Sequence, residues 1–438
     1  MFQKNNIKYI LILAIGFFWC SSLYLTQEQY LANFASVNIV NVVELLFGSL
    51  SMALGILLFG LLYRKNVNVK NLYLIFMMLS VVVMIVGFAT DNIYLIGICM
   101  CLNCFLGTAG FGAGYHFSLL SLNVSKEYRG RVFAIGYALG SLGTYLLILL
   151  PENFYSTISS LFLYIPIVVL NLILVCNTTN LEVLSKEKCN KDIKSIFIKI
   201  IVIVLAMSLL SALSTDVIAL YTIDIAGGYG NTRIYYCLGL LIAGFLADKK
   251  RELFDIVTLA SFVFSLLCIV LLKDGYSIGI IAALSYSFVA FFVVFRTISF
   301  VNLIDKSKYF AWAAGFGLML SRIMEGLMVL FEDQLIEHYL LLIVIISIII
   351  ALVMISYFTM YFNKSNETMD DKLKGLVIKY GLSNQEEKVL MLLIAGKSNQ
   401  EISEELYISI YTVKRHIANI YQKTKMNKRE LKELCYNR

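Results

Sequence analysis

Repeated apolar stretches, each about 20 residues long, constrain the fold of this chain more than any other feature of its sequence. The apolar core of a bilayer is about 30 Å thick, so a helix that crosses it needs about 20 apolar residues. The sequence therefore predicts an all-α, polytopic membrane bundle. Twelve stretches meet the requirement: roughly 7–25, 37–62, 72–90, 93–122, 132–150, 154–176, 196–220, 233–247, 253–272, 276–304, 310–331 and 339–362.

Charged residues are distributed unevenly along the chain. Residues 1–362 carry 22 Lys/Arg and 19 Asp/Glu, whereas the 76 residues from 363 to 438 carry 14 and 10. The hydrophobic fraction of the whole chain is 59%, above the roughly 45–50% of soluble proteins. We therefore expect a membrane domain at 1–362, a linker with a lead-in helix at 363–380, and a soluble, mildly basic domain at 381–438.

The first apolar stretch has one alternative interpretation. Lys4 and Lys8 precede it, as basic residues precede the apolar run of a signal peptide. Its length and the further apolar stretches favour a retained membrane helix. Nine cysteines lie in the chain without paired spacing in any loop, which argues against a secreted disulfide scaffold. The Cys101–Cys104 segment offers at most half a metal site, so we expect packed cysteines and no metal.

The loops between these stretches predict an orientation in the cell membrane. With a cytoplasmic N-terminus, the inner segments hold 17 Lys/Arg residues, while the outer loops hold Lys273, with Arg233 at the outer rim of the eighth stretch. Short loops rich in Lys and Arg stay inside. We therefore expect both termini in the cytoplasm, where the soluble domain can meet DNA.

The longest inner loop, 177–195, divides the membrane domain into two sets of six predicted helices. Residues 244–251 (GFLADKKR) place a glycine, an acid and a basic cluster after a predicted helix, and residues 60–65 (GLLYRK) repeat the pattern with Arg64 in place of the acid. Residues 110–114 (GFGAG) and 129–131 (RGR) follow in the fourth and fifth helices. Together these features resemble the major facilitator superfamily. The resemblance implies its twelve-helix fold and names no substrate.

Ionisable residues inside the membrane are costly and usually face the interior of a bundle. The candidates in the apolar stretches are Glu44, Asp216, Arg296, Arg322 and Glu325. Arg322 and Glu325 are three residues apart, so they share a helix face and are expected to pair. We predict a ligand cavity that uses Glu44, Arg296, Arg322 and Glu325. The alternative is an internal ion pair that only locks helices together.

The C-terminal segment is marked by helix caps. Ser383 with Glu386 and Ser398 with Glu401 form two capping boxes, each of which predicts the start of a helix. Gly381 and Gly396 follow helical patterns as C-terminal caps. Ser409 is expected to cap a third helix, and Asn427 with Glu430 opens a fourth.

Two helices joined by a three-residue turn, with a basic second helix, describe a helix-turn-helix. Val413, Ile417 and Ile420 form the buried stripe of its second helix. Lys414 and Arg415 are long enough to reach guanine edges in a major groove. Lys423 and Lys425 suit phosphate contacts. The candidate DNA-binding residues on or beside the exposed side are Thr412, Lys414, Arg415, Ala418, Asn419 and Lys423.

The segment from Leu382 to Arg429 resembles the LuxR-type DNA-binding domain of many bacterial regulators. The matching residues include Glu386, Val389, Leu390, Gly396, Ser398, Asn399, Glu401, Ile402, Leu406, Ile408, Ser409, Thr412, Val413, Lys414, His416, Asn419, Ile420, Tyr421 and Lys423. The resemblance implies base contacts from Lys414, Arg415 and Ala418, and phosphate contacts from Thr412 and Lys423. It also implies homodimerisation through the helix that begins at Asn427. Gln385 and Thr424 depart from the family, which often has arginine and leucine there.

The combination predicts a membrane-bound, one-component transcription regulator that binds promoter DNA and whose bilayer-embedded part senses a small molecule or membrane signal. One alternative is a major-facilitator-type transporter with a regulatory DNA-binding tail. The other is a membrane protein whose tail docks on a protein, which a net tail charge of only +4 leaves open. No phosphate-binding loop, nucleophile elbow or zinc motif is present in the sequence, so we expect neither an enzyme nor a cofactor.

Overall fold

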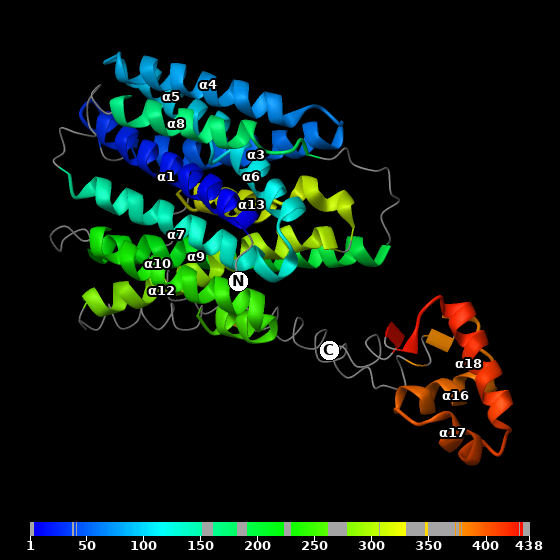
Figure 1. The fold of residues 1–438 in the computed structure, drawn as a ribbon. Coiled ribbons are helices and arrows are strands. Elements are labelled where there is room, and N and C mark those ends of the chain that lie inside the picture. The colour runs from blue at the N-terminus through cyan, green and yellow to red at the C-terminus, as the bar shows by residue number, and fades with distance from the viewer. Residues whose placement is uncertain are drawn as a thin grey trace. The chain divides into compact units, whose positions relative to one another are not determined.

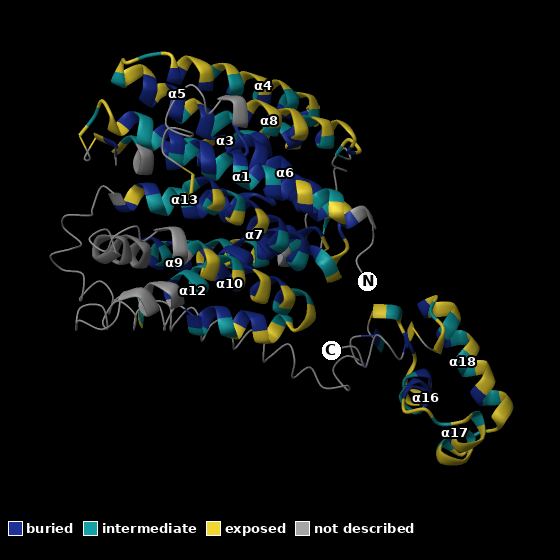
Figure 2. Cartoon of the chain, turned by 60° about the vertical axis from the view of Figure 1, so that its left-hand side comes forward, coloured by how far each residue is buried: buried dark blue, intermediate teal, exposed yellow. Residues whose placement is uncertain are grey.

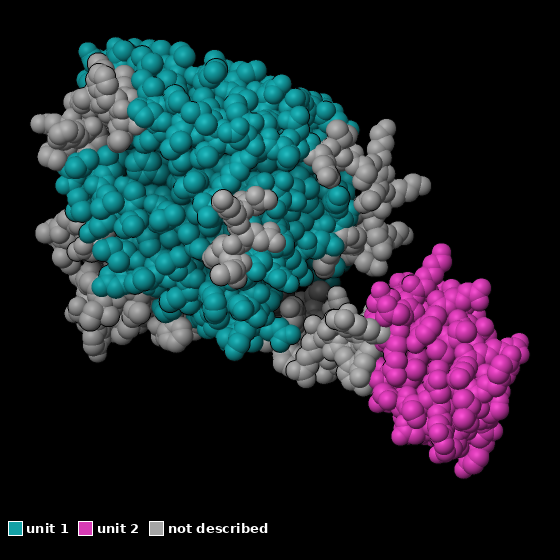
Figure 3. All heavy atoms as spheres, in the orientation of Figure 1, with its two compact units in different colours: residues 1–350 teal, residues 351–438 magenta. Residues whose placement is uncertain are grey.

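The computed structural model of the chain divides into two compact units, residues 1–350 and residues 351–438 (Figure 3). Every regular element in the part of the chain that the structure describes is a helix. The all-α fold predicted from the sequence is therefore confirmed. The described residues are 4–36, 39–40, 42–150, 161–181, 191–222, 229–261, 278–305, 307–329, 347–348, 373, 376–377, 379–428 and 430–431.

The first unit is a bundle of long helices that lie side by side (Figure 1). Its N-terminal half contains α1 (Lys4–Ala32), the π-helix η1 (Val42–Gly48), α3 (Ser49–Arg64), α4 (Val69–Phe88), α5 (Ile93–Leu106), α6 (Phe111–Asn123), the 3₁₀-helix η2 (Lys126–Tyr128), α7 (Arg129–Ile148) and α8 (Leu161–Cys176). Its C-terminal half contains α9 (Lys191–Thr222), α10 (Tyr229–Lys249), α12 (Ile278–Val301), the 3₁₀-helices η5 (Asn302–Asp305) and η6 (Lys308–Ala313), and α13 (Phe316–Val329). Within the bundle, α7 packs against α1 of its own half and against α10 of the other half.

The outer surface of the bundle is apolar. Ile75, Met78 and Val82 on α4 are 51%, 61% and 55% exposed, and Figure 2 shows exposed residues along the whole of this helix. So large an apolar surface suits lipid and not water. The first unit therefore belongs to an integral membrane protein.

Helix lengths in the described ranges agree with this assignment. Six helical segments there are long and apolar enough to cross a membrane, and the shorter apolar helices Ser49–Arg64 and Tyr164–Cys176 accompany them. Of the predicted stretch 253–272, residues 262–272 lie outside the described residues, as does all of 339–362 except 347–348. The six segments are Asn6–Ala32, Val69–Phe88, Ile93–Asn123, Lys126–Ile148, Lys194–Ala212 and Ser285–Asp305.

The fourth apolar stretch, expected to be one helix over 93–122, is broken into α5 and α6. The backbone of Gly107 is extended, with ψ −167°, so the helical hydrogen-bond ladder ends there. A Cβ atom on Gly110 would lie 2.4 Å from the carbonyl oxygen of Phe105, and one on Gly55 of α3 would lie 2.3 Å from the same oxygen. Only glycine permits this close packing at the break.

The second unit contains α16 (Asn384–Ile394), α17 (Asn399–Leu406) and α18 (Ile410–Thr424). Both predicted capping boxes, at Ser383 and Ser398, are present. Gly381 and Gly396 adopt left-handed backbone angles, with φ 59° and 92°, which end the preceding helices as predicted. Among the described residues, six side chains with no exposed surface form the centre of the core: Val389, Leu390, Ile402, Val413, Ile420 and Leu431.

The connection that precedes this unit is described only in part. Residues 373, 376–377 and 379–380 are helical, within the predicted lead-in helix. Leu373 and Leu376 are buried in the same core as α16 and α18. The predicted polar linker at 363–369 lies outside the described residues.

Candidate DNA-binding helix and membrane cavity

The helix α18 owes its position to local sequence. Ser409 caps it, because its Oγ accepts a hydrogen bond from Thr412 N at 3.1 Å. The turn before it contains Tyr407 in the left-handed region, with φ 53°, where Tyr407 N donates to the carbonyl of Glu404 at the end of α17. Val413 and Ile420 are buried in the unit's core. These features fix both the start and the rotation of α18.

The rotation presents one basic face to solvent. Lys414, Arg415 and Ala418 are exposed, while Thr412 and Asn419 are half-buried beside them. Figure 2 shows this exposed stripe along α18. Tyr411, which is 80% exposed, belongs to the same face. The sequence reasoning missed it, although its spacing to Arg415 and Ala418 follows the helical repeat.

Lys423 is engaged within the unit. Its Nζ lies 2.7 Å from Oε2 of Glu386 and donates to the carbonyl oxygen of Gly381 at 3.2 Å. Ser383 N donates to the same Glu386 oxygen at 2.8 Å. Lys423 thus holds α18 to the start of α16. A phosphate contact from Lys423 stays a prediction, and it would compete with this ion pair.

Glu386 is only 3% exposed, yet its pKa lies below the ordinary value of 4.5. Burial alone would raise this pKa, but hydrogen bonds from Lys423 and Ser383 outweigh it. A carboxylate with a lowered pKa stabilises the fold above its unfolded pKa, and this contribution is lost as the pH falls through the folded pKa.

Glu386→Gln should therefore lower the free energy of unfolding of residues 370–438 by about 1–3 kcal/mol at neutral pH. The difference from the parent should shrink as the pH falls below 4.5, where the parent itself becomes protonated. Urea denaturation across that pH range measures both effects. Glu387→Gln, on the same first turn of α16, is the control. An equal loss in both variants would show that helix charge, and not the ion pair, is responsible.

The last predicted helix begins as expected. Asn427 N donates to Oε2 of Glu430 at 2.8 Å, and Glu430 N donates to Oδ1 of Asn427 at 3.0 Å. This is the reciprocal arrangement of a capping box. Leu431 is fully buried in the unit's core. The role of this helix in dimerisation stays a prediction.

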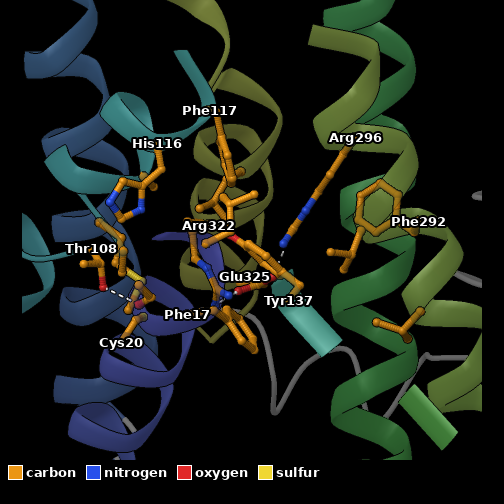
Figure 4. Close-up of a pocket in the computed structure, with 18 of the residues that line it drawn as sticks. Phe17, Cys20, Thr108, His116, Phe117, Tyr137, Phe292, Arg296, Arg322 and Glu325 are labelled. Atoms are coloured by element: carbon orange, nitrogen blue, oxygen red, sulfur yellow. Dashed lines mark hydrogen bonds and ion pairs between the residues drawn. The ribbon is translucent and has the colours of Figure 1, made fainter. Parts of the chain in front are cut away.

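A cavity of about 180 Å³ lies inside the membrane unit. Both halves line it: α1, α6 and α7 on one side and α10, α12 and α13 on the other. Figure 4 shows the rings of Phe17, Phe117, Tyr137 and Phe292 around its centre. Phe17 and Tyr137 stack at a centroid distance of 4.3 Å. Aromatic rings therefore form part of the walls, beside polar and aliphatic side chains.

Three charged side chains converge in this cavity. Arg322 Nη1 lies 2.5 Å from Oε2 of Glu325, so the pairing predicted from their spacing is confirmed. Arg296 reaches in from α12, with Nη1 4.0 Å from Oε1 of Glu325 and a hydrogen bond to Ser321. In Figure 4 both arginines point toward Glu325. Their role in ligand binding stays a prediction.

Glu44 lies in the π-helical turn η1, but the structure does not describe its side chain. The same holds for the side chain of Asp216. The sequence reasoning missed several wall residues, among them Cys20, Thr108, His116 and Tyr137. His116 is 4% exposed, with Nε2 3.0 Å from the Tyr73 hydroxyl. Among the described residues, no group of three His, Cys, Asp or Glu side chains is arranged to hold a metal.

Among the described residues, two ion pairs cross from one half of the bundle to the other. Arg129 at the start of α7 contacts both carboxylate oxygens of Asp305 at 2.9 Å, and also donates to Oδ1 of Asn302. Arg131 Nε lies 2.9 Å from Oδ2 of Asp248 at the end of α10. The sequence motifs at 129–131 and 244–251 thus meet in space.

Asp248 also caps α7. Tyr128, at the N-cap position, makes no side-chain cap hydrogen bond. Instead Gly130 N and Arg131 N donate to the Asp248 carboxylate at 2.7 and 2.9 Å. The first amides of a helix have no partner within it, and their partial positive charge attracts a carboxylate. A side chain of the C-terminal half therefore completes a helix of the N-terminal half.

In the N-terminal half, the position that corresponds to Asp248 makes a different contact. Arg64 stands where the motif would have an acid, and its guanidinium carbon lies 4.9 Å from the ring centre of Trp312 and 6.0 Å from that of Tyr309. Both rings belong to η6 of the C-terminal half. A cation–π contact therefore occupies the place of the carboxylate cap.

Comparison with known proteins identifies the C-terminal segment. Residues 381–434 match the family described as "Bacterial regulatory proteins, luxR family". The chain is 48% identical over 48 residues to the transcriptional regulatory protein LiaR of Bacillus subtilis (strain 168), and 50% identical over 48 residues to the transcriptional regulatory protein DegU of Brevibacillus brevis. These matches cover 11% of this chain and 23% and 20% of the two relatives. The chain thus spans about a fifth of each relative's length.

Solved structures resemble the membrane unit. A variant of the E. coli fucose:proton symporter FucP aligns with a TM-score of 0.55 and 15% identity, covering 80% of this chain and 97% of that one. The human organic anion transporter MFSD10 aligns with a TM-score of 0.56 and 10% identity, over 74% and 91%. A variant of the nucleoside transporter NupG aligns with a TM-score of 0.50 and 14% identity, over 81% and 99%. At these identities the likeness shows the fold alone.

The chain therefore carries a LuxR-type helix-turn-helix domain near its C-terminal end and a membrane unit with the major-facilitator fold. Both resemblances seen in the sequence are confirmed. The LuxR-type domain implies DNA binding. The combination fits a transcription regulator that is an integral membrane protein.

Proposed function

We propose that this chain is a one-component, membrane-bound transcription regulator. Residues 1–362 sense a small molecule or a membrane signal, and residues 381–438 bind promoter DNA. Residues 363–380 link these two parts. The observation that carries the proposal is that one chain joins a LuxR-type domain to a membrane unit with a charged internal cavity. Neither part is expected to catalyse a reaction or to need a cofactor.

DNA recognition in this proposal uses the exposed face of α18. Lys414, Arg415 and Ala418 contact base edges, and Asn419 lies beside them. Thr412 and Lys423 contact phosphates. Exposure of the first three side chains supports the assignment. Two chains pair on DNA through the helix that begins at Asn427.

Sensing in this proposal depends on two arrangements of the bundle's halves. A ligand shifts a two-state equilibrium only if it binds one state better than the other. The cavity is lined by both halves, so its shape changes when they move. The ion pairs of Arg129 with Asp305 and of Arg131 with Asp248 hold one arrangement. The loops that carry them are rich in Lys and Arg, which supports a cytoplasmic location for this end and for both termini.

Filling the cavity should disconnect the signal from transcription. Ala109 lines the cavity and is 8% exposed, so Ala109→Leu leaves less room for a ligand. We expect expression from the target promoter to stop responding to growth conditions. In typical allosteric proteins such a response corresponds to a coupling of about 5–150-fold. Reporter expression measures it, with membrane accumulation checked by immunoblot.

Leu146→Phe is the matched control, because Leu146 lies on the outer surface of α7 and is 55% exposed. This variant should respond like the parent. If Ala109→Leu keeps the full response while it accumulates normally, the cavity is not the sensing site.

A second candidate function is transport with attached regulation. It is favoured by the internal cavity and by the fold shared with the fucose:proton symporter and the nucleoside transporter. Saturable, gradient-driven uptake of a small molecule by vesicles that contain the full chain would establish it. Uptake no greater than in empty vesicles, together with an intact promoter response, would exclude transport and support the sensor function.

A further inference from the structure

The described walls of the cavity hold more positive than negative charge. Arg296 and Arg322 supply two guanidinium groups, and Glu325 supplies one carboxylate. Guanidinium groups remain charged in proteins, so these three side chains leave one positive charge without a counterpart. The excess is costly at Arg296, because its side chain is only 6% exposed and charge is poorly solvated there.

The hydrogen bonds of the two arginines are also incomplete. The Nε atoms of Arg296 and Arg322 are both buried and have no hydrogen-bond partner. Arg296 as a whole is 5% exposed. A buried donor that lacks an acceptor destabilises the structure. Glu325, held by Arg322 and 4.0 Å from Arg296, does not satisfy all the donors.

We propose that the cavity binds a small monocarboxylate, which Arg296 and Arg322 hold through its two oxygens. The fork of N–H groups on a guanidinium matches a carboxylate in geometry as well as in charge. A single negative charge neutralises the excess, whereas a dianion would leave a new one. This proposal rests on the proposed function, because it names the class of ligand that the sensing cavity takes.

The cavity also indicates the body of the ligand. Its volume is about 180 Å³, and a protein cavity of about 150 Å³ holds one benzene molecule. Phe17, Phe117, Tyr137 and Phe292 line part of its wall. A carboxylate that bears one aromatic ring or a branched aliphatic group fits this space. A chloride ion would leave most of this space unfilled.

Thermal unfolding of the full chain in lipid nanodiscs tests the proposal. The chain has 2 tryptophans, Trp19 and Trp312, both in the membrane unit, so their fluorescence reports the unfolding of that unit. Benzoate should raise the unfolding temperature by several degrees in a saturable way. Benzamide, benzylamine and sodium chloride should not. Benzamide or benzylamine acting as strongly as benzoate, or no shift with benzoate, would overturn the proposal.

Two substitutions sharpen the test because they should act in opposite directions. Arg296→Gln removes a positive charge and should weaken benzoate binding about tenfold or more. Glu325→Gln removes the competing carboxylate and should strengthen it by a similar factor. General damage to the fold cannot strengthen binding. If Arg296→Gln does not accumulate, Glu325→Gln alone decides, and weaker benzoate binding in that variant contradicts the proposal.

These measurements are independent of transcription. If benzoate does not bind but Ala109→Leu still abolishes the promoter response, the sensor remains and the ligand class is wrong. If benzoate binds and the promoter never responds to carboxylates or to cavity substitutions, the ligand class stands and the sensor function is wrong.

Discussion

Replacing Lys414 and Arg415 together with alanine is expected to abolish sequence-selective promoter binding by residues 370–438. Both side chains are exposed on α18, and one good bidentate contact to a base discriminates by about 1–3 kcal/mol. Loss of two such contacts should lower the preference for the promoter over random DNA about 30-fold or more. Weak, salt-sensitive binding should persist, because other basic residues still contact phosphates.

Footprinting on the target promoter and competition with random DNA measure this preference. The control replaces Lys388, which is exposed, and Lys397, which is half-buried and paired with Glu405, with alanine. Both lie outside α18, and the change in charge is the same. The control should bind more weakly at low salt but keep its footprint. If the Lys414 and Arg415 variant gives the parent's footprint, α18 does not read the bases through this face.

The DNA-binding unit could be predicted in detail because its signals are local. Ser383, Ser398 and Ser409 each cap a helix through a residue three positions away. Glycine supplies the left-handed angles at positions 381 and 396. What sequence could not supply was the long-range ion pair between Lys423 and Glu386, because its partners are 37 residues apart.

The membrane cavity was predicted only through its charged residues, since ionisable side chains in apolar stretches usually face the interior of a bundle. Arg322 and Glu325 lie on one helical turn, so their pairing follows from spacing. Tyr137 and His116 gave no such signal, because membrane helices are apolar on every side and their periodicity does not distinguish lipid from interior. The break at Gly107 was likewise hidden in a continuous apolar stretch. Beside the break, Gly55 of α3 packs closely against the backbone of Phe105 and Gly110.

The contact of Asp248 with the start of α7 connects these local patterns to the movement of the halves. The motif at 244–251 and the residues at 129–131 were recognised separately, and the structure brings them together. Asp248 is nearly inaccessible, with 2% of its side chain exposed. It accepts hydrogen bonds from two backbone amides and from Arg131. Its carboxylate therefore stabilises one arrangement of the two halves.

Asp248→Asn should release that arrangement. The substitution keeps the shape of the side chain but replaces one acceptor oxygen with an NH₂ group. This group cannot accept a hydrogen bond from the N–H groups of Gly130 and Arg131. The loss of charge-assisted hydrogen bonds should cost about 2–3 kcal/mol. A change of 1.4 kcal/mol corresponds to a factor of ten. The population ratio of the arrangement that has this contact to one that lacks it should therefore fall roughly 30- to 140-fold.

Hydrogen exchange of the Gly130 and Arg131 amides measures this opening directly. These amides lie in the first turn of α7 and have Asp248 as their acceptor, so their protection reports on the contact between the halves. Asp255→Asn is the control, because Asp255 is also buried but pairs with Arg251 four residues away, without crossing between the halves.

Protection should fall at Gly130 and Arg131 only in Asp248→Asn, and the promoter response should become independent of the signal. If exchange accelerates equally in both variants, the substitutions act by general destabilisation. If exchange accelerates only in Asp248→Asn while the signal response is unchanged, movement of the halves is not what the DNA-binding domain detects.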